Sequence, residues 1–177
     1  MERAIHLAEQ LLALARSDPQ ELAVEFGPVD LGAVVAEGVT DAHDLALARG
    51  IDLGLEAAPN LVVRGDREAL RILVRNLVDN AVRYTPPQGA VQVRCRSTDA
   101  GTVIEVIDTG PGIPASDRDR VFDRFYRRAG SQENGTGLGL AIVKSIAEHH
   151  GARVALGEVP SGGLHVTVSF SRPIGTS

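Results

Sequence analysis

Apolar residues recur at intervals of three and four along four stretches of the chain, which is the spacing of α-helices that bury one face. The predicted helices cover residues 2–16, 31–49, 66–84 and 138–149. Asp30 is predicted to cap the start of the second helix, because its carboxylate can accept backbone N–H groups there. Gly50 and Gly151 are typical of helix ends, and Pro86 and Pro87 stop the third helix.

Shorter runs in which apolar and polar residues alternate predict β-strands. They lie near residues 22–29, 51–55, 61–64, 90–97, 102–108, 152–157 and 164–170. Cys95 falls among the apolar positions of its strand, which predicts a packing role. Helices and hairpins follow one another without a regular β-α-β alternation. This order favours an α+β sandwich with the helices on one face of the sheet.

One long connection interrupts this pattern of helices and strands. Residues 109–137 contain few apolar side chains and many glycine, aspartate and arginine residues. A connection of this length is typical of a functional loop or lid. We therefore expect residues 109–137 to cover a site.

Composition narrows the class of protein. The 177 residues can form a buried core, and their formal net charge of −5 argues against a nucleic-acid partner. Aromatic residues make up only 3%, which leaves few platforms for stacking bases. The single cysteine suits a reducing compartment, and no apolar run is long enough to cross a bilayer. We expect a cytoplasmic domain that makes no direct contact with a membrane.

The helix at 66–84 carries a row of polar residues beside its apolar stripe. Asn76, Asn80 and Arg83 follow one another at helical spacing and share one side. Asparagine costs stability inside a helix, whereas its carboxamide oxygen is a hard ligand that suits Mg²⁺. The row alone is equally consistent with solvated surface amides.

Residues 108–113, Asp-Thr-Gly-Pro-Gly-Ile, follow directly from a strand. Alternation places Asp108 on the same face as Ile104 and Val106, where a carboxylate needs a partner. The exocyclic amine of adenine would be such a donor, whereas guanine presents an acceptor instead. Gly110 and Gly112 would let a ligand approach the backbone. An ordinary aspartate turn is the alternative.

Two further motifs lie in and after the expected lid. Residues 135–140, Gly-Thr-Gly-Leu-Gly-Leu, lead into the last helix, where free N–H groups and the helix dipole favour an anion. They match neither a Walker loop nor a Rossmann fingerprint. Phe122 and Phe125 are predicted to anchor the lid, from which Arg127 would reach a phosphate. The alternative is a polar loop held down by its own aromatic residues.

Taken in order, these motifs are more specific than any one of them. They read Asn-Leu-x-x-Asn-Ala-x-x-Tyr at 76–84, Asp-x-Gly-x-Gly-Ile at 108–113, Phe-x-x-Phe at 122–125 and Gly-x-Gly-x-Gly-Leu at 135–140. The set resembles the catalytic ATP-binding domain (HATPase_c, GHKL type) of bacterial two-component sensor histidine kinases, over about residues 29–171. The resemblance implies the Bergerat fold, a two-layer α/β sandwich with a mixed, mostly antiparallel sheet and an ATP lid.

The resemblance also implies a role for individual residues. Asn80 would be the main Mg²⁺ ligand with Asn76 assisting, Asp108 would bind the adenine amine, and Tyr84 would lie against the base. The implied catalytic residues are Asn76, Asn80, Arg83 and Arg127. The other implied nucleotide-binding residues are Gly110, Gly112, Ile113, Phe122, Phe125, Asn134, Gly135, Thr136, Gly137, Leu138, Gly139 and Leu140.

The function that follows from the resemblance is transfer of the γ-phosphoryl group of MgATP to a histidine. That histidine would lie on a dimerisation domain, of the same or a partner kinase, that this chain lacks. Residues 1–18 resemble the end of the second helix of such a dimerisation hairpin, 19–28 would form a linker and first strand, and 172–177 a flexible tail. A response regulator would act downstream, and the chain would be the cytoplasmic part of an inner-membrane sensor.

The chain also departs from the family pattern. None of its five histidines, His6, His43, His149, His150 and His165, stands in a phosphoacceptor motif, so the fragment is expected to bind ATP without efficient autophosphorylation. His149 and His150 end a helix, where protonated imidazole would suit the dipole. Leu164 follows two glycines where many relatives have threonine, which puts a water-mediated adenine contact there in doubt. A stand-alone GHKL-type ATPase and a degenerate nucleotide-sensing module remain as alternatives.

Overall fold

The computed structural model describes residues 26–126, 136–160 and 162–171, and its elements follow the predicted order. The helices are α2 (Leu31–Arg49), α3 (Arg67–Tyr84) and α4 (Gly139–His149). The strands are β1 (Gly27–Asp30), β2 (Asp52–Ala57), β3 (Val62–Gly65), β4 (Ala90–Thr98), β5 (Gly101–Asp108), β6 (Arg153–Glu158) and β7 (Leu164–Ser171). Short 3₁₀ turns at Ala115–Asp117 and Arg120–Phe122 lie between β5 and α4. The predicted helix at 2–16, the segment 1–18 and the tail 172–177 fall outside the described residues.

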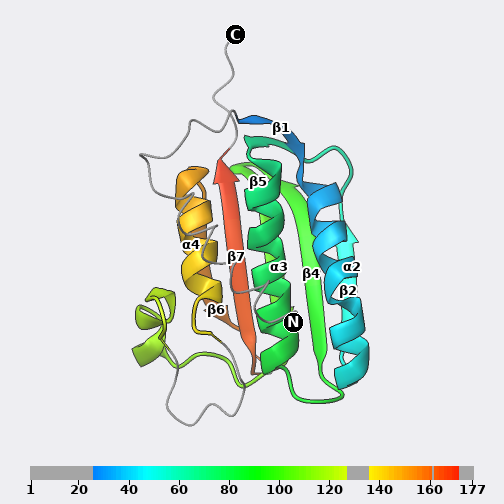
Figure 1. Ribbon diagram of the computed structural model, residues 1–177, viewed down its shortest axis with the longest axis vertical. Helices are drawn as coiled ribbons and strands as arrows, with labels where there is room; N and C mark the ends of the chain where they lie inside the picture. The colour runs from blue at the N-terminus through cyan, green and yellow to red at the C-terminus, as the bar shows by residue number, and fades with distance from the viewer. Residues whose placement is uncertain (1–25, 127–135, 161, 172–177) are drawn as a thin grey trace.

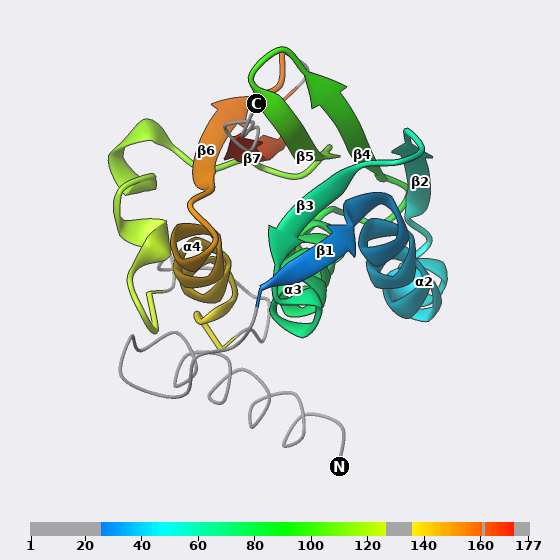
Figure 2. The ribbon, with the colours of Figure 1, turned by 90° about the horizontal axis from the view of Figure 1, so that it is seen from above.

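The main sheet has the strand order β2-β4-β5-β7-β6. Its β2 and β4 are parallel, and the other neighbouring strands are antiparallel. A separate antiparallel pair joins β1 and β3. Figure 2 shows α2, α3 and α4 side by side along one face of the main sheet. The predicted α+β sandwich with a mixed, mostly antiparallel sheet is confirmed.

Local capping explains where the helices begin and end. The Asp30 and Asp66 carboxylates accept N–H groups of the first turns of α2 and α3. Gly50 ends α2 in the left-handed conformation, with φ 64°. Thr85 ends α3 one residue before Pro86, as the proline pair predicts.

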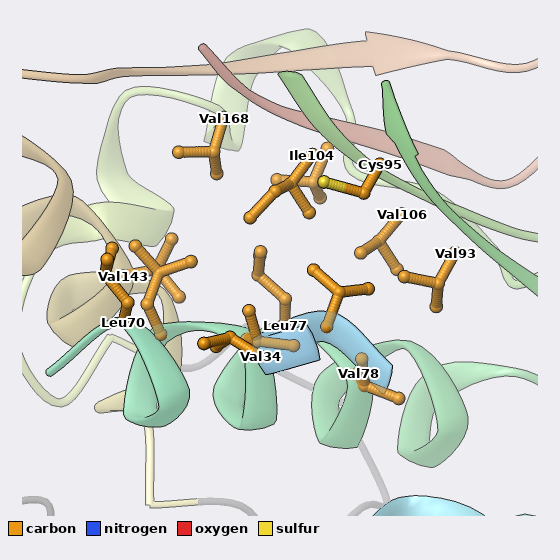
Figure 3. Packing of buried hydrophobic residues seen from close by; sticks show 14 of the residues in the cluster. Val34, Leu70, Leu77, Val78, Val93, Cys95, Ile104, Val106, Val143 and Val168 are labelled. Carbon is orange, nitrogen blue, oxygen red and sulfur yellow. The ribbon is translucent and has the colours of Figure 1, made fainter. Parts of the chain in front are cut away.

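The core fills the space between the helices and the sheet (Figure 3). Side chains from α2, α3 and α4 meet those of the central strands, among them Val34, Leu70, Leu77, Val143, Ile104 and Val168. Cys95 is 1% exposed, and burial, with a smaller effect of the Asp30 charge, raises the pKa of its thiol to about 12. Its predicted packing role is confirmed. None of the helices within the described ranges is long and apolar enough to cross a membrane.

His150 corrects one expectation about the end of α4. Its Nε2 lies 3.0 Å from the backbone nitrogen of Asp66, which can only donate, and its Nδ1 lies 2.8 Å from the carbonyl oxygen of Ile146. The ring is therefore neutral and carries its proton on Nδ1. Burial lowers the pKa of His150, and the ring stacks on Phe26 at 4.7 Å. The imidazole joins the residue before β1, the start of α3 and α4, and the expected imidazolium is wrong for His150.

Candidate functional site

The described parts of the four sequence motifs lie at one end of the molecule. In Figure 1, the C-terminal ends of α2 and α3, the loop that leaves β5 and the start of α4 all lie at the bottom, whereas β1 lies at the top. The chain order of the fold explains this arrangement, because α3 and β5 run toward this end and α4 runs away from it. Residues 76–84, 108–113 and 136–140 are therefore neighbours in space although far apart in sequence.

Asp108 is a buried carboxylate with one oxygen already used by the protein. The residue is 4% exposed, and its Oδ1 accepts the N–H groups of Gly110 at 2.8 Å and Leu164 at 3.2 Å. Within the described residues, nothing donates a hydrogen bond to Oδ2. Burial raises the pKa of Asp108, and the two backbone hydrogen bonds oppose that rise. The site thus holds an acceptor oxygen that suits an external donor.

Glycines allow the backbone around Asp108 to pack closely. A Cβ on Gly163 would collide with the carbonyl oxygen of Asp108 and lie 2.9 Å from its carbonyl carbon. A Cβ on Gly112, which has φ 65°, would lie 2.8 Å from the Gly163 carbonyl oxygen. On Gly110 a Cβ would lie 2.9 Å from the carbonyl oxygen of Tyr84. The close backbone packing at these three glycines joins the loop after β5 to the end of α3 and to the start of β7.

Sequence reasoning missed the part that β7 plays in this site. Leu164 was singled out for its side chain, whereas its backbone N–H is what holds Asp108. The adjacent glycines Gly162 and Gly163 before a strand were the available signal, since paired glycines mark positive φ or close backbone approach. Asp108, the partner of Leu164, is 56 residues away and leaves no local pattern beside these glycines.

The asparagines on α3 are not two solvated surface amides. Asn76 is 3% exposed, and its Nδ2 donates to the carbonyl oxygen of Ile72 at 2.8 Å. Asn80 is half-buried, one turn later. A Cβ on Gly139 would lie 2.7 Å from Nδ2 and 3.0 Å from Oδ1 of Asn80. The motif at 76–84 therefore contacts the motif at 135–140, because the first residue of α4 is a glycine.

Within the described residues, no side chain caps the N-terminus of α4. Its cap residue, Leu138, is fully buried and has no side chain that could accept the free N–H groups. The Leu138 N–H itself lies 3.4 Å from the hydroxyl of Thr136. An uncapped helix start that faces a polar site attracts an anion through its N–H groups and its dipole.

The described part of the predicted lid is attached through its backbone. The Phe125 N–H donates to the carbonyl oxygen of Gly137 at 3.0 Å, and Gly137 has φ 70° where a Cβ would lie 2.9 Å from the Phe125 carbonyl carbon. The Phe122 ring lies 5.5 Å from the ammonium of Lys144 on α4. By contrast, Phe125 is 67% exposed, so its ring is not the anchor that we expected.

The remaining predicted residues are distributed as follows. Tyr84 is 40% exposed at the end of α3, beside the half-buried Arg83. Ile113 is partly buried, and its carbonyl oxygen accepts a hydrogen bond from Nε of Arg118 at 3.2 Å. Arg118 also pairs with Glu158 and so fastens the start of the predicted lid to β6. Leu140 is partly buried in the first turn of α4. The predicted residues Arg127, Asn134 and Gly135 lie outside the described part of the chain.

Comparison with known proteins places the chain in a family. Residues 65–174 match the family described as "Histidine kinase-, DNA gyrase B-, and HSP90-like ATPase". The swarming motility regulation sensor protein RssA of Serratia marcescens is 35% identical over 159 residues, which are 89% of this chain and 34% of that protein. The chain thus spans about a third of the length of this curated relative.

Solved structures agree with the family match. A mycobacterial sensor histidine kinase, MprB, is 32% identical and superposes with a TM-score of 0.74, over 85% of this chain and 100% of that one. Full-length ShkA in complex with AMPPNP is 27% identical with a TM-score of 0.79, over 94% of this chain and 35% of that one.

Proposed function

This chain belongs to the family of histidine kinase-, DNA gyrase B- and HSP90-like ATPases, as the catalytic ATP-binding domain of a sensor histidine kinase, and from this membership we propose that it binds MgATP at the ends of α3 and β5 and the start of α4. The observation that carries the proposal is the buried Asp108 carboxylate, with Oδ1 held by two backbone N–H groups. Its Oδ2 would accept a hydrogen bond from the exocyclic amine of adenine.

This arrangement favours adenine over guanine. Guanine presents a carbonyl oxygen where adenine presents its amine, so two acceptors would face each other in a buried site. Gly110 and Gly112 keep the backbone free of side chains beside Asp108. Tyr84 would lie against the base, since its own carbonyl oxygen packs on Gly110 beside Asp108.

The residues beside the start of α4 fit the phosphates and a magnesium ion. The Asn80 carboxamide lies against Gly139, and a side chain at position 139 would fill the space beside that carboxamide. Its oxygen is a ligand type that Mg²⁺ accepts, and Asn76 would assist from the turn below. Mg²⁺, when bound, would neutralise charge on the phosphate oxygens. The N–H groups of the uncapped α4, the Arg83 guanidinium and the predicted Arg127 would position those phosphates.

The phosphoryl acceptor would be a histidine on a dimerisation domain, with a response regulator acting downstream. Among the described histidines, two lie away from the phosphate end of the proposed site and a third lies beside a carboxylate. His149 and His150 lie at the far end of α4 from its N-terminus, and His165 lies 3.2 Å from Glu105. A stand-alone ATPase would need a general base where this chain has Asn76, whose carboxamide is too weakly basic to accept a proton at neutral pH.

The test of this function uses the isolated chain, [γ-³²P]ATP and Mg²⁺. We expect the chain to retain nucleotide while neither labelling itself to a significant fraction nor hydrolysing ATP steadily, because the acceptor histidine is elsewhere. Acid-labile label on the protein and released phosphate are measured over one hour. Stoichiometric self-labelling would contradict the separate acceptor, and steady hydrolysis would favour the ATPase alternative instead.

A further inference from the structure

Arg49, the last residue of α2, connects the C-terminal ends of two helices. Its Nη2 donates to the carbonyl oxygen of Arg83 at 2.8 Å and lies 3.5 Å from that of Thr85. The last carbonyl groups of a helix have no partner within the helix, and a cation beside them also suits the dipole. Figure 1 shows α2 and α3 side by side with these ends at the bottom of the molecule. Arg49 thus caps α3 from outside.

The turn that follows α3 is bound to the same end of α2. The Gln88 N–H donates to the carbonyl oxygen of Gly50 at 3.0 Å, and the Asp52 N–H donates to that of Gly89 at 2.9 Å. Thr85 is fully buried, and its hydroxyl donates to the carbonyl oxygen of Ala81 at 2.7 Å. The turn at 85–89, although exposed at residues 86–88, is therefore fixed by its backbone to the end of α2.

The opposite side of this turn faces the residues around Asp108. The carbonyl oxygen of Tyr84 lies where a Cβ on Gly110 would come within 2.9 Å. A Cβ on Gly89 would lie 2.7 Å from the hydroxyl oxygen of Thr109, and that hydroxyl accepts the Ala90 N–H at 2.9 Å. The backbones at these glycines pack so closely that no side chain fits between them. A shift at the end of α3 would therefore also move the neighbours of Asp108.

We propose that Arg49 is a positioning residue for the adenine side of the nucleotide site. Its guanidinium holds the end of α3 so that Tyr84 and the loop after Asp108 keep the spacing that the base requires. The proposal rests on the proposed function, because it concerns the same site. It assigns to the last turn of α2 a part in base recognition, although Arg49 would not touch the nucleotide.

The test compares Arg49→Met, which keeps the length of the side chain without the guanidinium, with Arg49→Lys, which keeps a cationic donor. Calorimetry with the full chain, below the unfolding range of every variant, measures the affinities for ATP and GTP with and without Mg²⁺. Arg49→Met is expected to weaken ATP binding by up to roughly tenfold, because ATP must then order the end of α3 that a charged hydrogen bond holds in the wild type. The ratio of ATP to GTP affinity falls, the strengthening by Mg²⁺ stays, and Arg49→Lys recovers most of the loss.

Arg71→Met is the matched control. Arg71 also joins α3 to α2, through an ion pair with Asp41 at 3.2 Å, but it stands at the opposite end of α3 from Tyr84. Its replacement should leave both nucleotide affinities unchanged. Equal losses in the two variants, or a folded Arg49→Met that binds ATP like the wild type, would overturn the positioning role alone. A wild type that binds no ATP would overturn the proposed function and this role with it.

Discussion

Replacement of Asp108 by asparagine should lower the affinity for ATP about 10- to 100-fold, because a charged hydrogen bond contributes about 1.5–3 kcal/mol. Asparagine has the same shape, and its Oδ1 can still accept the N–H groups of Gly110 and Leu164. Its amide nitrogen would replace Oδ2, however, and a donor would then face the donor of adenine. Calorimetric titration measures the loss.

The same variant should fold at least as stably as the wild type. Burial raises the pKa of Asp108, so folding favours the protonated carboxyl. The stability that this group contributes is present below its unfolded pKa and is lost as the pH rises through the raised folded pKa. Above this raised pKa the free domain carries an ionised, buried carboxylate at a cost, which a neutral amide removes. Thermal unfolding of the free domain at pH 7 measures this effect.

Glu105→Gln is the control, three residues earlier on β5. Glu105 is 7% exposed, and a hydrogen bond from Arg96 at 2.7 Å lowers its pKa. The stability that Glu105 contributes is therefore present at neutral pH and is lost as the pH falls through the lowered pKa. Glu105→Gln should lose stability and keep ATP affinity, the reverse of Asp108→Asn. Two variants that behave alike would contradict the separate roles of these carboxylates.

Replacement of Gly163 by alanine should destabilise the domain by about 3 kcal/mol or more, whereas the neighbouring Gly162→Ala should cost about 1 kcal/mol. Both glycines have positive φ, 85° at Gly162 and 102° at Gly163, so both substitutions strain the backbone. A Cβ on Gly162 meets nothing within 4 Å, but one on Gly163 collides with the backbone of Asp108. Only the second substitution must push β5 and β7 apart.

Urea unfolding of the two alanine variants measures this difference. Because the collision lies at Asp108, Gly163→Ala should also weaken ATP binding under conditions in which it is fully folded. Gly162→Ala should bind ATP normally and thus controls for backbone strain. Equal losses of unfolding free energy in the two variants would contradict the close packing of Gly163 on the Asp108 backbone.

The elements of the fold were predictable because each depends on residues close together in sequence. Asp30 and Asp66 cap the helices that follow them, and Gly50 ends α2 in a conformation that glycine favours. Alternation along β5 also predicted that Asp108 faces inward. In these cases a local pattern is sufficient, since the physical cause lies within a few residues.

Contacts between distant segments left no such pattern. The backbone N–H of Leu164 and the packing of Gly163 on Asp108 depend on two strands that meet only in the folded sheet. The helix dipole predicted a protonated His150, but burial and the Asp66 N–H outweigh it. Asn76 could equally have been a surface amide, because periodicity alone does not tell how wide the buried face of α3 is.

The most direct test of the central claim is calorimetric titration of the wild-type chain with ATP and with GTP, each in the presence and absence of Mg²⁺. If Asp108 recognises adenine and the start of α4 holds the phosphates with Mg²⁺, ATP should bind, Mg²⁺ should strengthen its binding, and GTP should bind roughly tenfold or more weakly. Failure to bind ATP under either condition, or equal affinities for the two nucleotides, would contradict the account.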